Sequence, residues 1–183
     1  RGLGDVYKRQ KRLRTLKALT AHLEAEVTPA NGYQHDLTKA VFRGRALFGE
    51  DDPLPAVSIL DSPTAERAAR RTGDDDLIES ATSREDWTLL IQGWVDDDKL
   101  NPTDPAFNLM ADVRKALAKI NQGYDMQTGR PAHPNYMLGG LVEGMTMEPG
   151  VARPPEQGVS SRAFFWMRVA LQFVEDENDP FAD

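Results

Sequence analysis

The residues best suited to chemistry are two runs of three aspartates, at residues 74–76 and 96–98. Carboxylate oxygens are the ligands that magnesium and calcium accept. Neither run fits a known binding loop, because such loops alternate ligands with other residues and close on a glutamate, whereas consecutive side chains point in different directions. We therefore expect both runs to carry solvated loop charge. A metal-dependent hydrolase built on them is the remote alternative.

Histidine, cysteine and serine chemistry is poorly supported. The chain has three histidines and no cysteine. His22 lies in a predicted helix, His35 in a turn and His133 in a Pro-Ala-His-Pro loop, and no two of them have the spacing of metal ligands. No serine lies in a Gly-x-Ser-x-Gly elbow, and no glycine-rich phosphate loop follows a predicted strand. The sequence therefore predicts no catalytic residue, no metal and no cofactor, which indicates that the protein is not an enzyme.

Composition argues against two further classes of function. The 183 residues carry a net charge of −7. Broad binding to a phosphate backbone needs a surplus of lysine and arginine, which this charge does not provide. No apolar run approaches the ~18 residues of a membrane span. We expect a soluble protein with no membrane partner and no specific nucleic-acid ligand.

The two ends of the chain differ from the rest. Residues 1–10 read RGLGDVYKRQ and resemble the translation of a sequencing adapter, so we expect a non-native segment outside the fold. Without it the net charge is −9. The expected organisation is one domain over residues 11–176, followed by an acidic tail over residues 177–183.

The pattern of apolar residues predicts the elements that must position these side chains. Three- and four-residue spacing predicts helices over residues 11–27 and 105–120, the second opened by Asp104 as N-cap and Pro105. Alternation predicts strands over 56–60, 87–95, 141–147 and 163–174, with a short one near 40–44. The order α-β-β-β-α-β-β indicates an α+β fold, with a mixed, largely antiparallel sheet of about five strands packed against two main helices.

The last predicted strand is apolar on both faces. One face carries Phe165, Met167, Val169, Leu171 and Phe173, and the other carries Phe164, Trp166, Ala170 and Val174. Either helices cover both faces or another subunit covers one of them. Trp87, Trp94 and Trp166 all lie in predicted strands, where core or half-buried positions are the simpler interpretation. A stacking platform for nucleic acid would need basic neighbours that are mostly missing.

The connection over residues 62–84 is unusually long for two neighbouring strands. Its first half is basic and its second half is acidic. The charged residues are Arg67, Arg70, Arg71, Asp74, Asp75, Asp76 and Glu79. Two interpretations stay open: a flexible linker with neutralised charge, or an arm that becomes ordered against a neighbouring subunit.

Several segments together resemble a known family. They are the sequence VFRGR at residues 41–45, FGEDDPLP at residues 48–55, IQG at residues 91–93, the helix over residues 102–120, FFW at residues 164–166 and ED at residues 175–176. With this layout, residues 11–176 resemble the tail terminator proteins of long-tailed bacteriophages, which are also described as head-tail joining or minor tail proteins. The family is recognised by layout more than by invariant chemistry. The start of the chain and a turn-rich insertion over residues 124–136 depart from its pattern.

The resemblance implies a structural virion protein without catalysis. Such a protein is assembled in the host cytoplasm and caps the tail tube as a ring, usually a hexamer, at the head-proximal end of the tail. Its partners are further copies of itself, the major tail tube protein and a head-completion connector protein, and DNA can pass through the ring. Other head-tail joining, tail completion or minor tail proteins, and a tail-associated chaperone, are the nearest alternatives.

The family has no catalytic or binding motif to carry over, so the contact residues are predicted here from charge and from the two apolar faces of the last strand. We expect contacts between subunits at the charged residues of the long connection and at Trp166. Arg43 and Arg45, which lie beside a turn, are the expected salt-bridge partners of another protein, with ordinary solvated charge as the alternative.

Overall fold

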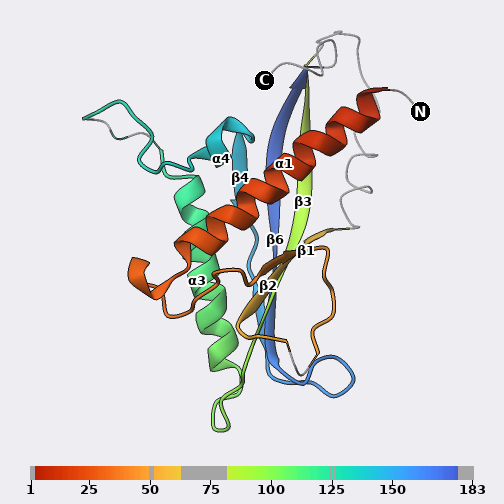
Figure 1. The fold of residues 1–183 in the computed structure, drawn as a ribbon, viewed down its shortest axis with the longest axis vertical. Coiled ribbons are helices and arrows are strands. Elements are labelled where there is room, and N and C mark those ends of the chain that lie inside the picture. Colours follow the sequence, from red (N-terminus) through yellow and green to blue (C-terminus); the bar gives the residue numbers. More distant parts are fainter. Residues whose placement is uncertain (1–2, 50–51, 63–81, 124, 126, 177–183) are drawn as a thin grey trace.

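The computed structural model describes residues 3–49, 52–62, 82–123, 125 and 127–176. Two longer helices and a sheet account for most of them (Figure 1). The helical elements are α1 (Leu3–Glu26), the 3₁₀ turn η1 (Pro29–Asn31), α3 (Asp104–Ile120) and α4 (Met137–Gly140). The strands are β1 (Val41–Arg43), β2 (Ala56–Asp61), β3 (Thr82–Val95), β4 (Gly144–Met147), β5 (Val151–Arg153) and β6 (Ala163–Asp176).

The sheet is mixed and largely antiparallel, which confirms the predicted α+β fold. Its strand order is β1-β2-β3-β6-β4, and β5 also pairs with β6. β1 runs parallel to β2, while all the other pairs are antiparallel. β3 and β6 form its centre, because they pair along their full length from Thr82 opposite Asp176 to Val95 opposite Ala163.

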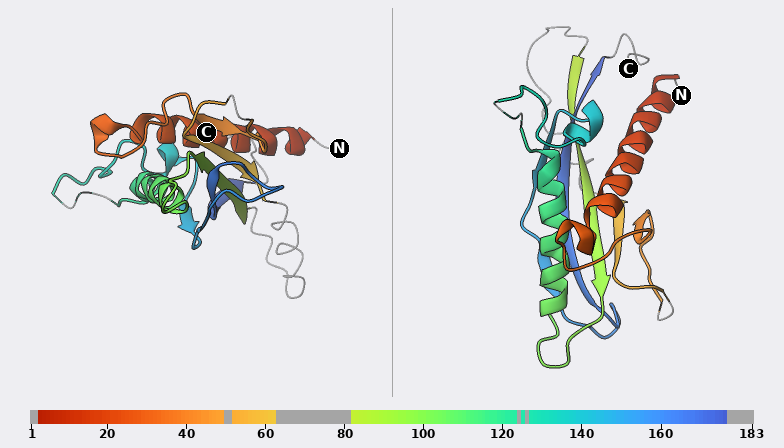
Figure 2. Two further views of the ribbon diagram at one scale, coloured as in Figure 1. Left: turned by 90° about the horizontal axis from the view of Figure 1, so that it is seen from below. Right: turned by 60° about the vertical axis from the view of Figure 1, so that its left-hand side comes forward.

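One face of the sheet carries the hydrophobic core. Alternate residues of β3 and β6 that were predicted to share a face are fully or almost fully buried there, including Leu89, Ile91, Met167 and Val169. α3 packs against β3, β5 and β6, while α1 packs against β1, α3 and α4. In Figure 1, α3 runs alongside the long strands and α1 crosses the molecule diagonally, and Figure 2 shows the same arrangement from two other sides.

The helices follow their predicted apolar stripes with shifted starts. α3 begins at Asp104, so Thr103 takes the N-cap position that the sequence assigned to Asp104, and Thr103 makes no side-chain capping hydrogen bond. Asp104 instead places its charge in the first turn, where the exposed amide groups of a helix favour an anion. α1 begins at Leu3, before the predicted start at residue 11.

The strands differ from the prediction in two places. β4 begins at Gly144 and not at the predicted residue 141, because the backbone amide of Val142 donates to the carbonyl of Met137 in α4 (Met137–Gly140) at 3.3 Å. β5 lies within the stretch that was expected to be only a loop between the last two strands. Three residues are too few for alternation to reveal a strand, and β5 forms because β6 offers its free edge.

Gly93 lets the two central strands pack closely. It lies opposite Phe165 in the register, and the ring of Phe165 covers it. A Cβ atom on residue 93 would lie 2.8 Å from Cζ and 2.9 Å from Cδ1 of that ring, which is too close for carbon atoms. The absence of a side chain at this position therefore makes room for a fully buried aromatic ring.

Candidate functional site

Five aromatic side chains form a continuous row on the sheet face that lies opposite the core. Phe42 of β1 contacts Phe48, with ring centroids 5.4 Å apart, and Phe48 packs on Trp94 of β3 at 4.4 Å. Trp94 lies opposite Phe164 of β6, and Phe164 stacks with Trp166 at 5.8 Å. We call Phe42, Phe48, Trp94, Phe164 and Trp166 the aromatic row.

The aromatic row is only partly covered. Trp94 is buried, with 8% of its surface exposed, because Phe48 lies on it. The other four members are half-buried. The core that α1 and α3 build with the sheet contains no member of the row. Among the described residues, both longer helices thus lie on the core side of the sheet. The two possibilities drawn from the sequence for the opposite face, a second helical layer or another subunit, both stay open.

Arg45 lies at one end of the aromatic row and is held by its own chain. Its guanidinium group donates hydrogen bonds of 2.6 Å to both carboxylate oxygens of Asp52. It also lies over the rings of Phe48 and Phe42, at 4.5 and 5.1 Å from their centroids. Hydrogen bonds from Arg45 and from the backbone of Gly49 hold the pKa of Asp52 below its usual range. Arg45 therefore fixes the loop that carries Phe48 onto the sheet.

Only some of the predicted contact residues are among those that the structure describes. Trp166 and Arg45 lie on the same sheet face, at opposite ends of the aromatic row, and Arg43 is exposed at the end of β1. The charged connection lies outside the described residues. Its predicted interface residues are Arg67, Arg70, Arg71, Asp74, Asp75, Asp76 and Glu79. The contacts expected of all these residues stay predictions.

The described aspartate run does not converge on one point. Asp96 accepts a hydrogen bond from Arg162, whereas Asp98 accepts two from the backbone of the following turn, from Leu100 and Asn101 at 2.8 Å each. The backbone groups of Asn101 and Leu100 also hold the pKa of Asp98 below its usual range. Residues 96–98 thus build a turn, and residues 74–76 lie outside the described part of the chain.

A second cluster, which the sequence prediction missed, joins α1 to distant parts of the chain. His22 and Glu26 lie one turn apart on α1, and His133 comes from the loop before α4. One potential ligand atom from each of these three residues lies within 4.8 Å of the other two. We call them the His-Glu-His cluster. The spacing of His22 and Glu26 on a predicted helix could have indicated two members of the cluster. The spacing between the histidines, on which the sequence prediction relied, could not indicate the cluster.

Every member of the His-Glu-His cluster has defined hydrogen bonds. The Nε2–H group of His22 donates to the carbonyl oxygen of Ala116 on α3 at 2.8 Å, and the side-chain amide of Asn135 donates to Nδ1 of His22 at 3.1 Å. The Nε2–H group of His133 donates to Oε1 of Glu26 at 2.8 Å. Glu26 forms an ion pair with Lys119 through its other oxygen.

These contacts set the charge of the cluster. Burial lowers the pKa of His22, which opposes its protonation near neutral pH. Burial would raise the pKa of Glu26, but hydrogen bonds from Lys119 and His133 outweigh this effect and lower it. At neutral pH, Glu26 is therefore an ionised carboxylate beside a neutral His22.

Asp112 forms a second buried polar junction, between α3 and the segment after η1. Its Oδ2 atom accepts hydrogen bonds from the backbone amides of Gln34 and His35 at 3.0 Å, and from Nδ1 of His35 at 2.8 Å. Asp112 is 7% exposed. Because these hydrogen bonds tie α3 to the segment after η1, we interpret this junction as structural.

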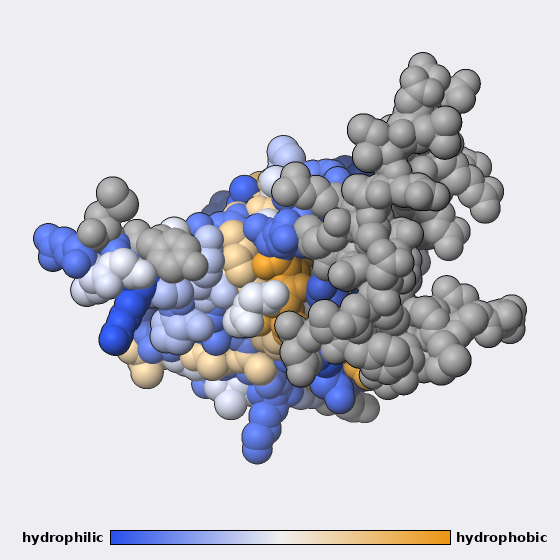
Figure 3. Space-filling view, turned by 90° about the horizontal axis from the view of Figure 1, so that it is seen from above, coloured by the Kyte–Doolittle hydropathy of each residue, from blue (hydrophilic) through white to orange (hydrophobic). Residues whose placement is uncertain are grey.

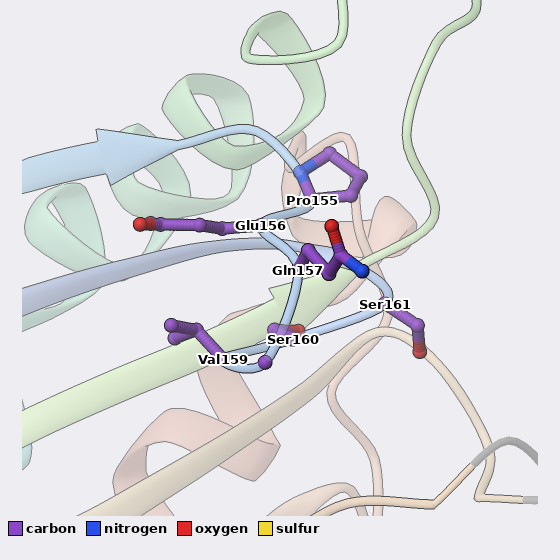
Figure 4. Close-up of a pocket in the computed structure, with 7 residues that line it drawn as sticks. Pro155, Glu156, Gln157, Val159, Ser160 and Ser161 are labelled. Carbon is purple, nitrogen blue, oxygen red and sulfur yellow. The ribbon is translucent and has the colours of Figure 1, made fainter.

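A hollow lies in the loop before β6, over residues 155–161. The labelled side chains of Glu156, Gln157 and Ser161 point away from one another there (Figure 4). The loop is closed by reciprocal backbone hydrogen bonds between Glu156 and Ser160. It therefore presents no convergent set of polar groups.

Viewed from the end of the molecule that lies uppermost in Figure 1, hydrophobic side chains form a central strip between hydrophilic ones (Figure 3).

None of the helices in the described part of the chain is long and apolar enough to cross a membrane. No protein-family model matches this chain, and no curated protein matches it either.

Proposed function

We propose that this protein is a tail terminator of a long-tailed bacteriophage, a structural virion protein that forms a ring by contacts between copies of itself. The observation that carries the proposal is the aromatic row. Four of its five members come from segments on which the resemblance rests, since Phe42 and Phe48 belong to two of the quoted motifs and Phe164 and Trp166 to a third. The third motif lies far from the first two in the sequence, but all three meet on one surface.

The chemistry of the aromatic row suits contact between copies. Interfaces between identical subunits are more apolar than ordinary surface, and aromatic residues are enriched at their centres. Charges of both signs lie exposed near the row, with Arg43 beyond Phe42, Arg153 opposite Phe164 and Asp97 after β3. A ring uses head-to-tail contacts, in which different surfaces of neighbouring copies meet. Opposite charges at the rim of one apolar surface favour such a contact.

The proposal includes no catalytic role and no cofactor. Its partners are further copies of the chain, the tail tube protein and a head connector protein, and its place is the head-proximal end of the virion tail. Another head-tail joining or tail completion protein is the nearest alternative. Gene neighbourhood separates the two, because a terminator gene normally lies just before the gene of the major tail protein.

Mass measurement in solution tests the proposal. We expect light scattering after size exclusion to show a concentration-dependent assembly, and negative-stain images to show rings, alone or on tubes of the neighbouring tail tube protein. Trp166→Glu should abolish the assembly by placing a charge in the apolar contact. Phe107→Glu is the matched control, since Phe107 is aromatic, 50% exposed and lies on α3, which packs on the core side of the sheet.

Each result has a defined meaning. Circular dichroism checks that both variants stay folded, and Trp166→Ala replaces the glutamate variant if that one unfolds. A wild-type protein that stays monomeric at all concentrations and forms no ring on tubes would overturn the proposal. Assembly that persists in Trp166→Glu and Trp166→Ala would remove the aromatic row from the interface.

A further inference from the structure

We propose that His22, Glu26 and His133 bind one divalent transition-metal ion, for which zinc is the reference. This inference does not depend on the proposed function. Two imidazoles and one carboxylate form a ligand set that suits zinc, and the same nitrogen ligands suit cobalt and nickel. The hard cations magnesium and calcium prefer oxygen ligands and fit this set poorly.

The three side chains already converge. Zinc binds imidazole nitrogen and carboxylate oxygen at about 2.0–2.2 Å, so neighbouring ligand atoms of a tetrahedral site lie about 3.3–3.5 Å apart. In the cluster the ligand atoms lie within 4.8 Å of one another, and Nε2 of His133 lies 2.8 Å from Oε1 of Glu26. Shifts of about 1 Å, within reach of side-chain rotation, would complete the geometry.

His22 is held as metal-bound histidines are. Such histidines usually donate the second ring N–H to a carbonyl or carboxylate, which fixes the ring and directs the other nitrogen at the metal. The Nε2–H group of His22 donates to the carbonyl of Ala116, so Nδ1 carries no proton and presents a lone pair. The side-chain amide of Asn135 donates a hydrogen bond to Nδ1 of His22. Rotation of that amide by half a turn would present its oxygen to a metal ion instead. Asn135 thus stands where a fourth ligand belongs.

Two features oppose binding and limit its strength. Nδ1 of His133 accepts a hydrogen bond from the backbone amide of Asn135 at 3.1 Å, which places the proton on Nε2. Coordination through Nε2 requires that proton to move to Nδ1, so this hydrogen bond is lost. The Lys119 ammonium group on Glu26 also repels a cation. We therefore expect a dissociation constant in the micromolar range rather than the tighter binding of closed structural sites.

Metal titration of tag-free protein tests the proposal. After treatment with EDTA and dialysis, zinc chloride should bind with a stoichiometry of one in isothermal titration calorimetry. Cobalt chloride should produce the visible absorption bands of a tetrahedral site, and zinc should remove them. At a free zinc concentration a hundred times the dissociation constant, the melting temperature should rise by about 5–10 °C. Magnesium chloride should produce none of these effects.

Variants assign the site. His133→Gln and Glu26→Gln should each weaken zinc binding at least tenfold and abolish the cobalt bands. His35→Gln is the matched control, because His35 is also a partly buried histidine bound to a carboxylate but lies outside the cluster. His22 is 1% exposed, so its replacement risks unfolding and is not needed for the assignment.

Three outcomes would overturn the proposal. They are the absence of saturable zinc binding below about 0.1 mM, zinc binding that is unchanged in both cluster variants, and zinc binding that is lost in His35→Gln. In the first case the cluster is a hydrogen-bonded junction only. Melting temperatures measured in EDTA separate loss of metal binding from loss of fold, since a folded variant that no longer responds to zinc supports the assignment.

Discussion

Replacing Gly93 by alanine should destabilise the protein, although alanine is the better residue for an ordered chain. Gly loses more conformational freedom on folding, so an unhindered change to alanine in a strand stabilises by about 0.5–1 kcal/mol. At residue 93 the new Cβ would lie 2.8 Å from Cζ of Phe165 and closer still to Cε1. The ring must move by about 1 Å in a core where it is fully buried. Overpacking of this kind costs about 1–3 kcal/mol.

A double-mutant cycle isolates this contact. Phe165→Leu removes the part of the ring that lies over residue 93 and should itself cost about 1–2 kcal/mol through lost burial. In the double variant the Cβ of alanine fills space that the ring has left. We expect the double variant to be more stable than the sum of the two single changes predicts, by at least 1 kcal/mol.

Urea unfolding followed by circular dichroism measures the free energies of the cycle, at one protein concentration so that assembly does not bias the comparison. Gly123→Ala is the matched control, because a Cβ at residue 123 would meet no atom within 4 Å. It should leave stability unchanged or slightly raised. Additivity of Gly93→Ala and Phe165→Leu within about 0.5 kcal/mol would refute the reasoning, as would a stabilising effect of Gly93→Ala alone.

Two further predictions concern the polar junctions. Asp112→Ala should lower the free energy of unfolding by about 2–4 kcal/mol, because the amides of Gln34 and His35 would lose their charged acceptor, and Asp112→Asn should recover part of the loss in the same urea assay. Asp52→Asn should destabilise the protein only where Asp52 is ionised. The pKa of Asp52 in the folded protein lies below the ordinary value of 3.8. The stabilisation by the Arg45–Asp52 pair is therefore present above pH 3.8 and is lost as the pH falls through the folded pKa. The gap between the melting temperatures of the two proteins should therefore narrow as the pH falls below 3.8, and a gap that stays constant from about pH 7 to about pH 2 would contradict this assignment.

The core could be predicted from sequence because strand periodicity marks it. The parity of β3 places Leu89 and Ile91 on one face, and both are fully buried. The start of β3 at Thr82 was missed, since residues 82–86 are polar and pair with β6 without an apolar pattern of their own. Local patterns report burial well but do not report pairing, which the partner strand decides.

The candidate sites depended on contacts that no local pattern records. Phe48 lies in a loop, and only its packing on Trp94 brings it onto the sheet. His133 lies 107 residues from Glu26, with which it forms a hydrogen bond. The i, i+4 spacing of His22 and Glu26 was visible on a predicted helix, but the third member had no signal. Long-range geometry, and not residue type, is the missing information in both cases.

The aromatic row by itself is too small to hold a ring together. If roughly a fifth of each half-buried aromatic side chain of 150–250 Å² remains accessible, the four half-buried members offer about 120–200 Å² per copy. At about 25 cal/mol per Å², complete burial of that area contributes about 3–5 kcal/mol. Association costs an estimated 4–15 kcal/mol, and a standard interface buries about 800 Å² on each partner. In the proposed ring, the row would therefore form the apolar centre of a larger contact, with the remaining area supplied by surfaces around it. This explains why we expect assembly to depend on protein concentration, and why one charge at Trp166 should suffice to prevent it.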